Sequence, residues 1–127
     1  MATLIVDGAN VVGSRPDGWW RDRPGAAARL HARLVAADLP YPEVVLVLEG
    51  KARAGVPEGR EGSVRTVYAP ADGDTTIAAL TGAAAGQPVT VVTADRGLAA
   101  RVTAAGGGVV GPGWLLAQLP DIARPVP

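Results

Sequence analysis

The stretch TLIVDGANVVG, residues 3–13, combines an apolar run with an acid at its end. Residues 3–6 are continuously apolar, which is typical of a strand that is covered on both faces of a parallel sheet. Asp7 ends this run, and a glycine, a small residue and Asn10 follow before the chain becomes apolar again. Asp7 therefore falls just beyond the carboxyl end of a predicted strand, where open α/β sheets place their sites.

Four further stretches have the composition of strands. They are EVVLVL at 43–48, SVRTVYA at 63–69, PVTVVT at 88–93 and the short GVV at 108–110. Helical patterns separate them, with apolar residues three and four apart or a capping acid at the start. These patterns cover 24–37, 74–85, 95–106 and 113–119. The alternation predicts the α/β class, as a three-layer α/β/α sandwich with a central, mainly parallel sheet of four to five strands.

Size and composition limit the class of protein. A chain of 127 residues suits one domain, so 1–127 is expected to be a single domain. Twelve basic and twelve acidic side chains give a net charge of zero, so no global field attracts nucleic acid or a membrane. The chain has no cysteine and no apolar run of the roughly 18 residues that a spanning helix needs. A soluble, cytoplasmic protein is therefore expected.

Two segments have no clear helical or strand pattern. Residues 49–62, EGKARAGVPEGREG, are rich in glycine and charge, which predicts a mobile loop or an irregular turn. The basic side chains in and beside it make this region a candidate flap on the substrate side. They are Lys51, Arg53, Arg60 and Arg65. The final residues 120–127 are expected to be extended on the surface.

Asp7 belongs to a wider pattern of acids. Four others follow the predicted strands or open the next helix: Glu49, Asp72, Asp74 and Asp95. If the strands are parallel, all five acids lie at the same edge of the sheet. Crowded carboxylates repel each other and raise each other's pKa, so a cation is expected between them. Magnesium prefers oxygen ligands and is often held by one or two carboxylates together with substrate phosphates, and a pair of ions assists phosphodiester displacement.

Simpler structural roles also suit four of these acids. Asp74 and Asp95 precede helices and are equally suited to be N-caps, whereas Glu49 and Asp72 suit solvated loops. Asp7 differs from them because it follows a buried strand without opening an obvious helix.

Asn10 lies three residues after Asp7. Short polar side chains in turns form local hydrogen bonds. The side chain of Asn10 is therefore expected to tie the turn and to orient the Asp7 carboxylate.

Several other chemistries are excluded or disfavoured. The only histidine, His31, is far in sequence from Ser14 and Ser63, which argues against a Ser-His-Asp hydrolase, and the lack of cysteine argues against a typical zinc site. Neither a P-loop nor a dinucleotide fingerprint occurs. A phosphoaspartate protein fits poorly, because Ala9 stands where a dehalogenase-type site needs a second acid and the sole lysine, Lys51, is too early for a receiver.

Three stretches together carry a resemblance to a known family. They are LIVDGANVVGS at 4–14, GDTTIAAL at 73–80 and VVTADRGLAARV at 91–102. In these stretches the sequence resembles the NYN domains of the PIN-like nuclease superfamily. Together with the order of the strands, the resemblance spans nearly the whole chain. The resemblance is strongest to their small bacterial YacP-like branch.

The resemblance implies a parallel α/β/α sandwich whose acidic edge binds Mg²⁺ or Mn²⁺ and hydrolyses RNA phosphodiester bonds. By position, the acids Asp7, Asp74 and Asp95 correspond to those of the family, and Asn10 and Thr93 to its supporting polar residues. On this basis the three acids and Asn10 are the candidate catalytic residues. Glu49 and Asp72 are candidates to complete the metal shell through water.

The sequence departs from the family pattern at two positions. Relatives often have consecutive acids where this chain has Asp74 followed by Thr75, and often have Asp where Glu49 stands here. Both departures bear on whether a second metal ion is bound.

A loop that follows the first strand has the composition of a single-strand RNA-binding segment. Residues 15–23, RPDGWWRDR, place Trp19 and Trp20 beside Arg15, Arg21 and Arg23. Arginine neutralises phosphates and indole stacks on unpaired bases, so the two tryptophans with Arg15 and Arg21 are candidates for substrate binding. The alternative is that one or both tryptophans fix the loop to the following helix.

Three residues near the last candidate acid complete the predicted substrate-binding group. Thr93 and Arg96 flank Asp95, and Arg101 follows in the next helix. For the two arginines, a role in surface solvation is equally compatible with the sequence.

The sequence therefore predicts a metal-dependent ribonuclease, with endo or exo action left open, that acts on single-stranded or exposed RNA and is a monomer or a weak homodimer. The substrate and its delivery, for example by the ribosome, stay open, as does a role as a toxin. The alternative is a catalytically weak RNA-binding or protein-interaction module with the same fold.

Overall fold

The computed structural model describes residues 2–84 and 86–121, and within them one sheet has six strands in the order β3-β4-β2-β1-β5-β6. Neighbouring strands are parallel, except that β3 is antiparallel to β4. The strands are β1 (Thr3–Asp7), β2 (Glu43–Leu48), β3 (Gly59–Glu61), β4 (Val64–Tyr68), β5 (Val89–Val92) and β6 (Gly108–Val110).

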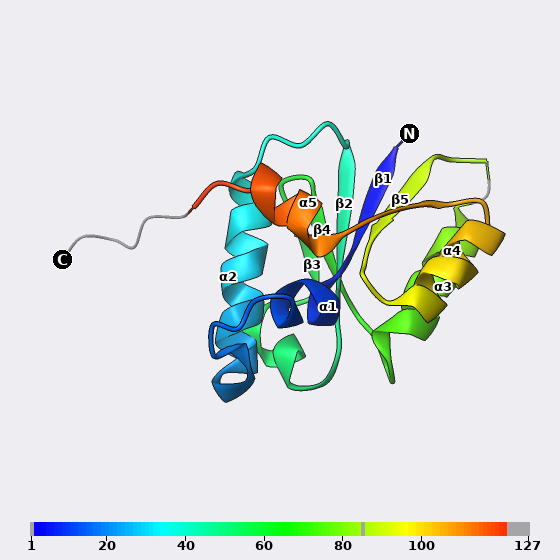
Figure 1. Ribbon diagram of the computed structural model, residues 1–127. Helices are drawn as coiled ribbons and strands as arrows, with labels where there is room; N and C mark the ends of the chain where they lie inside the picture. The colour runs from blue at the N-terminus through cyan, green and yellow to red at the C-terminus, as the bar shows by residue number, and fades with distance from the viewer. Residues whose placement is uncertain (1, 85, 122–127) are drawn as a thin grey trace.

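Helices cover both faces of this sheet, as Figure 1 shows. The α-helices are α1 (Gly8–Gly13), α2 (Arg23–Ala36), α3 (Gly73–Ala83), α4 (Arg96–Ala104) and α5 (Pro112–Gln118). The helices α1, α2 and α5 lie on one face, and α3 and α4 lie on the other. Two short 3₁₀ helices, η1 (Trp19–Arg21) and η2 (Gly50–Gly55), lie in the loops. The predicted three-layer α/β/α sandwich with a mainly parallel sheet is confirmed.

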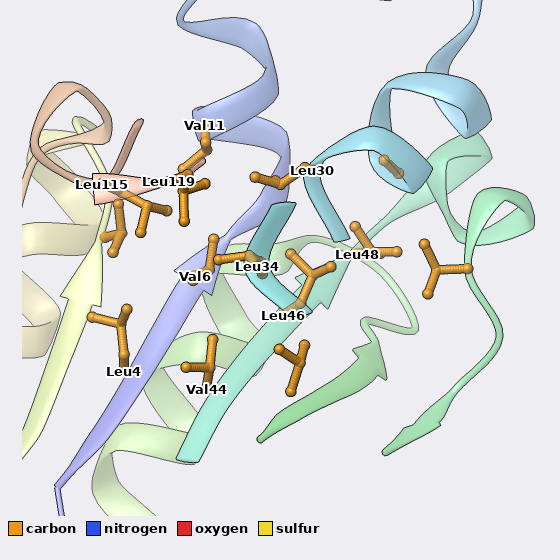
Figure 2. Packing of buried hydrophobic residues seen from close by; sticks show 14 residues of the cluster. Leu4, Val6, Val11, Leu30, Leu34, Val44, Leu46, Leu48, Leu115 and Leu119 are labelled. Atoms are coloured by element: carbon orange, nitrogen blue, oxygen red, sulfur yellow. The ribbon is translucent and has the colours of Figure 1, made fainter. Parts of the chain in front are cut away.

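The core consists of two apolar clusters, one on each face of the sheet. Side chains alternate along β1, so that Leu4 and Val6 join the cluster under α2 while Ile5 joins the cluster under α3 and α4. Figure 2 shows Leu34 of α2 between Val6 of β1 and Leu46 of β2. Burial on both faces explains why the central strands are continuous apolar runs in the sequence.

The segment predicted as an irregular connection holds two elements. Residues 49–62 contain η2 and also β3, which pairs with β4 and makes six strands where four to five were predicted. The strand β3 is three residues long and exposed at each of them. A strand without buried side chains has no apolar pattern, so the sequence did not indicate it.

The expectation that Asp7 opens no helix is wrong, because α1 begins at Gly8 and Asp7 is its N-cap. The backbone of α1 lies so close to β2 that a Cβ atom on Gly8 would be 2.7 Å from the carbonyl oxygen of Val47. Glycine is therefore required for this close approach. The six residues of α1 include two glycines, which hides the helix in a propensity-based reading.

The predicted long helices agree with the structure to within two residues wherever their ends are described. Residue 85 and most of the tail predicted for 120–127, namely 122–127, lie outside the described residues. Among the described helices, none is both long enough and apolar enough to cross a membrane.

Candidate functional site

The Asp7 carboxylate is fixed at the carboxyl end of β1, and the residue is only 4% exposed. Its Oδ1 accepts a hydrogen bond from the backbone N–H of Asn10 at 3.3 Å, and its Oδ2 accepts one from the Thr93 hydroxyl at 3.0 Å. Each oxygen therefore has a donor that belongs to a different segment of the chain. The carboxylate has one defined orientation at the edge of the sheet.

The loop after β5 supports Asp7 through two linked hydrogen bonds. The Thr93 hydroxyl oxygen accepts the N–H of Asp95 at 3.1 Å while it donates its own proton to Asp7. The side-chain oxygen of Asn10 accepts the N–H of Ala94 at 2.8 Å. The prediction that the Asn10 side chain orients Asp7 is therefore wrong in detail: the backbone of Asn10 binds Asp7, and its side chain holds the neighbouring loop.

Glu49 reaches the same edge from the end of β2. Its Oε2 accepts the N–H of Gly73, the first residue of α3, at 3.1 Å. A Cβ atom on Gly73 would lie 3.5 Å from Oε1 of Glu49 and 3.9 Å from Oδ1 of Asp7. The start of α3 therefore lies against both carboxylates, and Glu49 is half-buried rather than free in a solvated loop.

The three remaining acids lie at the starts of α3 and α4, the helices that cover the face of the sheet opposite to α1 and α2. The side chain of Asp72 caps α3 by accepting the N–H of Thr75 at 2.8 Å, and that of Asp95 caps α4 by accepting the N–H of Leu98 at 2.9 Å. The capping role is thus present for Asp95. Asp74, in the first turn of α3, is not the cap of that helix.

The charges of these acids act on one another. Burial raises the pKa of Asp7 from its ordinary value of 3.8 to about 6, against the lowering effect of the bonds from Thr93 and Asn10, and the charges of Asp74 and Glu49 add to the rise. The pKa of Asp74 is also raised, first by burial and then by the charges of Asp95, Asp72 and Glu49. The acids that follow different strands are therefore close enough to interact electrostatically.

Asp72 shows the opposite shift, because hydrogen bonds from Thr75 lower its pKa. The positive charge of Arg101 contributes to the lowered pKa of Asp72 and partly offsets the rise in the pKa of Asp74. Arg101 therefore acts on the acidic edge, although it is exposed, as is Arg96 at the start of α4.

The carboxylate oxygens at this edge suit a hard cation, but they do not form a complete set of protein ligands for one ion. Within residues 2–84 and 86–121, no three His, Cys, Asp or Glu side chains are placed to hold one metal ion together. Magnesium needs fewer protein ligands than that, because it keeps several waters and takes substrate phosphates into its shell. The oriented Asp7 carboxylate with one neighbouring acid therefore fits such an ion.

The two tryptophans of the predicted RNA-binding loop differ in exposure. Trp19 is half-buried, lies near Gly13 and has the Arg23 guanidinium 5.5 Å from its ring centroid. Trp20 is 51% exposed, contacts Trp19 edge to face at 6.0 Å between ring centroids, and has Arg21 5.8 Å from its own ring. The loop thus holds one partly fixed and one exposed indole.

The other predicted substrate residues lie in different places. Arg15 lines a cavity of about 240 Å³ together with Arg29 and Arg33 of α2, a cavity that none of the candidate acids lines. Thr93 is buried at 3% exposure and supports Asp7, so its assignment to substrate binding stays a prediction.

The flap prediction is wrong for two of its arginines. Arg60 and Arg65 pair with Glu43 at 3.8 and 3.2 Å, and Glu43 begins β2 at the edge of the sheet opposite to Glu49. Arg53 lies 5.9 Å from the ring centroid of Tyr68. These contacts hold β3 and η2 against the sheet.

One feature of the site was missed by reasoning from the sequence. It is the N–H of Gly73, which binds Glu49 from 24 residues away. A backbone donor leaves no signal in a sequence. The contact of Arg23 with Trp19 was indicated by the tryptophan and arginine composition of residues 15–23.

Comparisons with known proteins support the fold. No family model and no curated protein sequence matches the chain. Among solved structures, the fold is similar to a mutant of Rae1 (YacP) from Bacillus subtilis, with a TM-score of 0.60 and 19% sequence identity over 92% of this chain and 74% of that chain. At this identity the likeness establishes a YacP-like fold.

Proposed function

We propose that this protein is a metal-dependent ribonuclease that hydrolyses phosphodiester bonds in single-stranded or exposed RNA. The observation that carries the proposal is the buried Asp7 carboxylate, which accepts hydrogen bonds from two donors. Its pKa is raised by burial and, to a smaller extent, by the charges of Asp74 and Glu49. An arrangement that disfavours ionisation of an oriented acid is costly for folding, and a bound cation offsets that cost.

The residues of the chain divide the work between them. Asp7, with Glu49, Asp74 or Asp95, would hold Mg²⁺ or Mn²⁺. The ion supplies Lewis-acid activation of a phosphoryl oxygen and of water when it is bound. Thr93 and the backbone of Asn10 keep Asp7 aimed at the edge. Arg101, whose charge acts on Asp74, is placed to neutralise a nearby phosphate of the strand.

Two likenesses support this assignment. The sequence resembles NYN domains of the YacP-like branch, a resemblance that implies RNA hydrolysis, and the fold is similar to that of YacP. The metal, the cytoplasmic location and the monomeric or weakly dimeric state remain predictions.

The test is cleavage of end-labelled RNA without secondary structure, with Mg²⁺ or Mn²⁺ and with added chelator. The Asp7→Asn variant should lose cleavage. Asp38→Asn is the matched control, since Asp38 is an exposed acid that precedes β2 at the opposite edge of the sheet. Cleavage that survives in chelator, or equally in both variants, would contradict the proposal.

One observation favours a second candidate, an RNA-binding or protein-interaction module that cuts poorly. In the described part of the chain, no three potential ligands converge on one ion. Saturable RNA binding without metal-dependent cleavage in the same experiment would select this alternative.

A further inference from the structure

A cavity of about 290 Å³ opens directly beside the acidic edge. Gly8, the residue after Asp7, and Glu49 both line it, so it is continuous with the candidate active site. We call it the Trp19 cavity, because Trp19 is its one aromatic wall. The chemistry proposed for the acids does not require it.

Two planar groups form the distinctive part of the wall. The indole of Trp19 and the guanidinium of Arg23 both line the cavity and lie 5.5 Å apart, measured from the guanidinium carbon to the ring centroid. Ala52 and Ala71 line it with small side chains. An indole and a guanidinium plane are the groups on which proteins stack unpaired bases.

The charged groups of the cavity wall balance each other. Glu49 contributes a carboxylate and Arg23 a guanidinium, so the wall has no net charge that would favour a phosphate. A base is uncharged, and its N–H groups can donate to the Glu49 carboxylate. The volume of about 290 Å³ lies just below the range of roughly 300–1,000 Å³ for small-molecule pockets. One base fits such a space, and its phosphate stays outside.

We propose that the Trp19 cavity binds one unpaired base of an RNA strand, next to the phosphate that lies at Asp7. The inference rests on the proposed function for the identity of the strand. It adds a positioning element: one stacked base would fix the register of the strand relative to the acidic edge.

The sharpest test fills the cavity without removing any of its groups. Ala71 is exposed at the mouth, so Ala71→Leu should fold normally and block the cavity. Ala79→Leu, an exposed alanine of α3 that is not part of the cavity wall, is the matched control. Both changes are made in the Asp7→Asn background, so that binding of a fluorescent single-stranded RNA octamer is measured by anisotropy in Mg²⁺ without cleavage.

Ala71→Leu should weaken binding about tenfold, as expected for the loss of one stacked base, and Ala79→Leu less than twofold. Trp19→Ala should resemble Ala71→Leu, whereas Trp20→Ala should have a smaller effect. Replacing one nucleotide of the octamer by an abasic residue should reproduce the loss at a single position, and Ala71→Leu should then cause no further loss.

Equal affinities for the Ala71→Leu and Ala79→Leu proteins, or no measurable RNA binding, would overturn the inference. Its failure is distinguishable from that of the proposed function. If Ala71→Leu causes no further loss of affinity for the abasic octamer, and the protein never cleaves RNA, the assignment of the cavity stands without the ribonuclease activity. If metal-dependent cleavage occurs and Ala71→Leu does not affect it, the ribonuclease activity stands without the assignment of the cavity.

Discussion

The acids at the end of β1 and at the starts of α3 and α4 carry the same charge in very different surroundings. Asp7 is buried, both of its oxygens accept hydrogen bonds, and its pKa is raised to about 6. Asp72 is exposed, caps a helix and has a lowered pKa. Position at the sheet edge alone therefore does not make an acid a candidate for chemistry. Burial disfavours ionisation of Asp7, whereas hydrogen bonds stabilise the ionised form of Asp72.

The largest expected effect is on activity, and it tests whether the two acids really differ. Asp7→Asn should reduce metal-dependent RNA cleavage by more than about 100-fold, above the 10- to 100-fold that is typical for outer-shell partners of a metal. Asp72→Asn keeps a side-chain oxygen for the cap and should reduce cleavage less than about fivefold. Rates are measured with excess enzyme at saturating metal. Similar losses of cleavage in both variants would show that Asp7 and Asp72 do not differ in their roles.

The second prediction concerns stability as a function of pH. Because the folded-state pKa of Asp7 is raised from 3.8 to about 6, its favourable contribution is fully present below pH 3.8 and is lost as the pH rises through 6. Asn carries no charge, so Asp7→Asn should gain about 2 to 3 kcal/mol relative to wild type between pH 4 and pH 8. Urea unfolding at both pH values in chelator measures this change. A pH-independent difference would show that burial of the charge is not the cause.

The third prediction removes a support of Asp7 and leaves the acid in place. Thr93→Val deletes the hydroxyl that donates to Asp7 and should destabilise the protein by about 1.5 to 3 kcal/mol at pH 8, the range for a hydrogen bond to a charged group. Cleavage should fall about 10- to 100-fold. Thr93→Ser keeps the hydroxyl and should retain most of the activity. If the serine variant is as defective as valine, the methyl packing and not the hydrogen bond matters.

The smallest effect separates the two roles of Asp95. Asp95→Ser preserves an N-cap for α4 and should change stability by only a few tenths of a kcal/mol, whereas Asp95→Ala should cost about 1 kcal/mol. If the carboxylate also binds metal, both variants should lose cleavage to the same extent. Thermal unfolding and cleavage rates of the pair decide this, and full activity of Asp95→Ser would leave capping as its sole role.

The fold was largely predictable because a strand that is buried on both faces of a sheet is a continuous apolar run in the sequence. The run at 43–48 became a strand with the predicted bounds, and all of its residues except Glu43 are buried. The run at 108–110 also became a strand with the predicted bounds, although it lies at the border of the sheet and is only partly buried. The missed elements α1 and β3 are short and rich in glycine or fully exposed, so tertiary contacts rather than local preference form them.

The candidate site was predictable at the level of which segments meet. Parallel strands bring their carboxyl ends to one edge, which placed Asp7 and Glu49 together before any coordinates. The details were not predictable: whether the backbone or the side chain of Asn10 binds Asp7 depends on the pitch of α1, and the contact of Glu49 with Gly73 depends on where α3 begins.

The outermost strands, β3 and β6, have a bearing on solubility that is independent of the acidic site. Each is three residues long, so each border of the sheet offers only a short row of unpaired backbone groups to another molecule. Arg60 and Glu61 add charge to the β3 border. Short, charged borders are a common protection against strand addition and aggregation. A chain with zero net charge lacks long-range self-repulsion, so protection against strand addition falls to local features such as these borders.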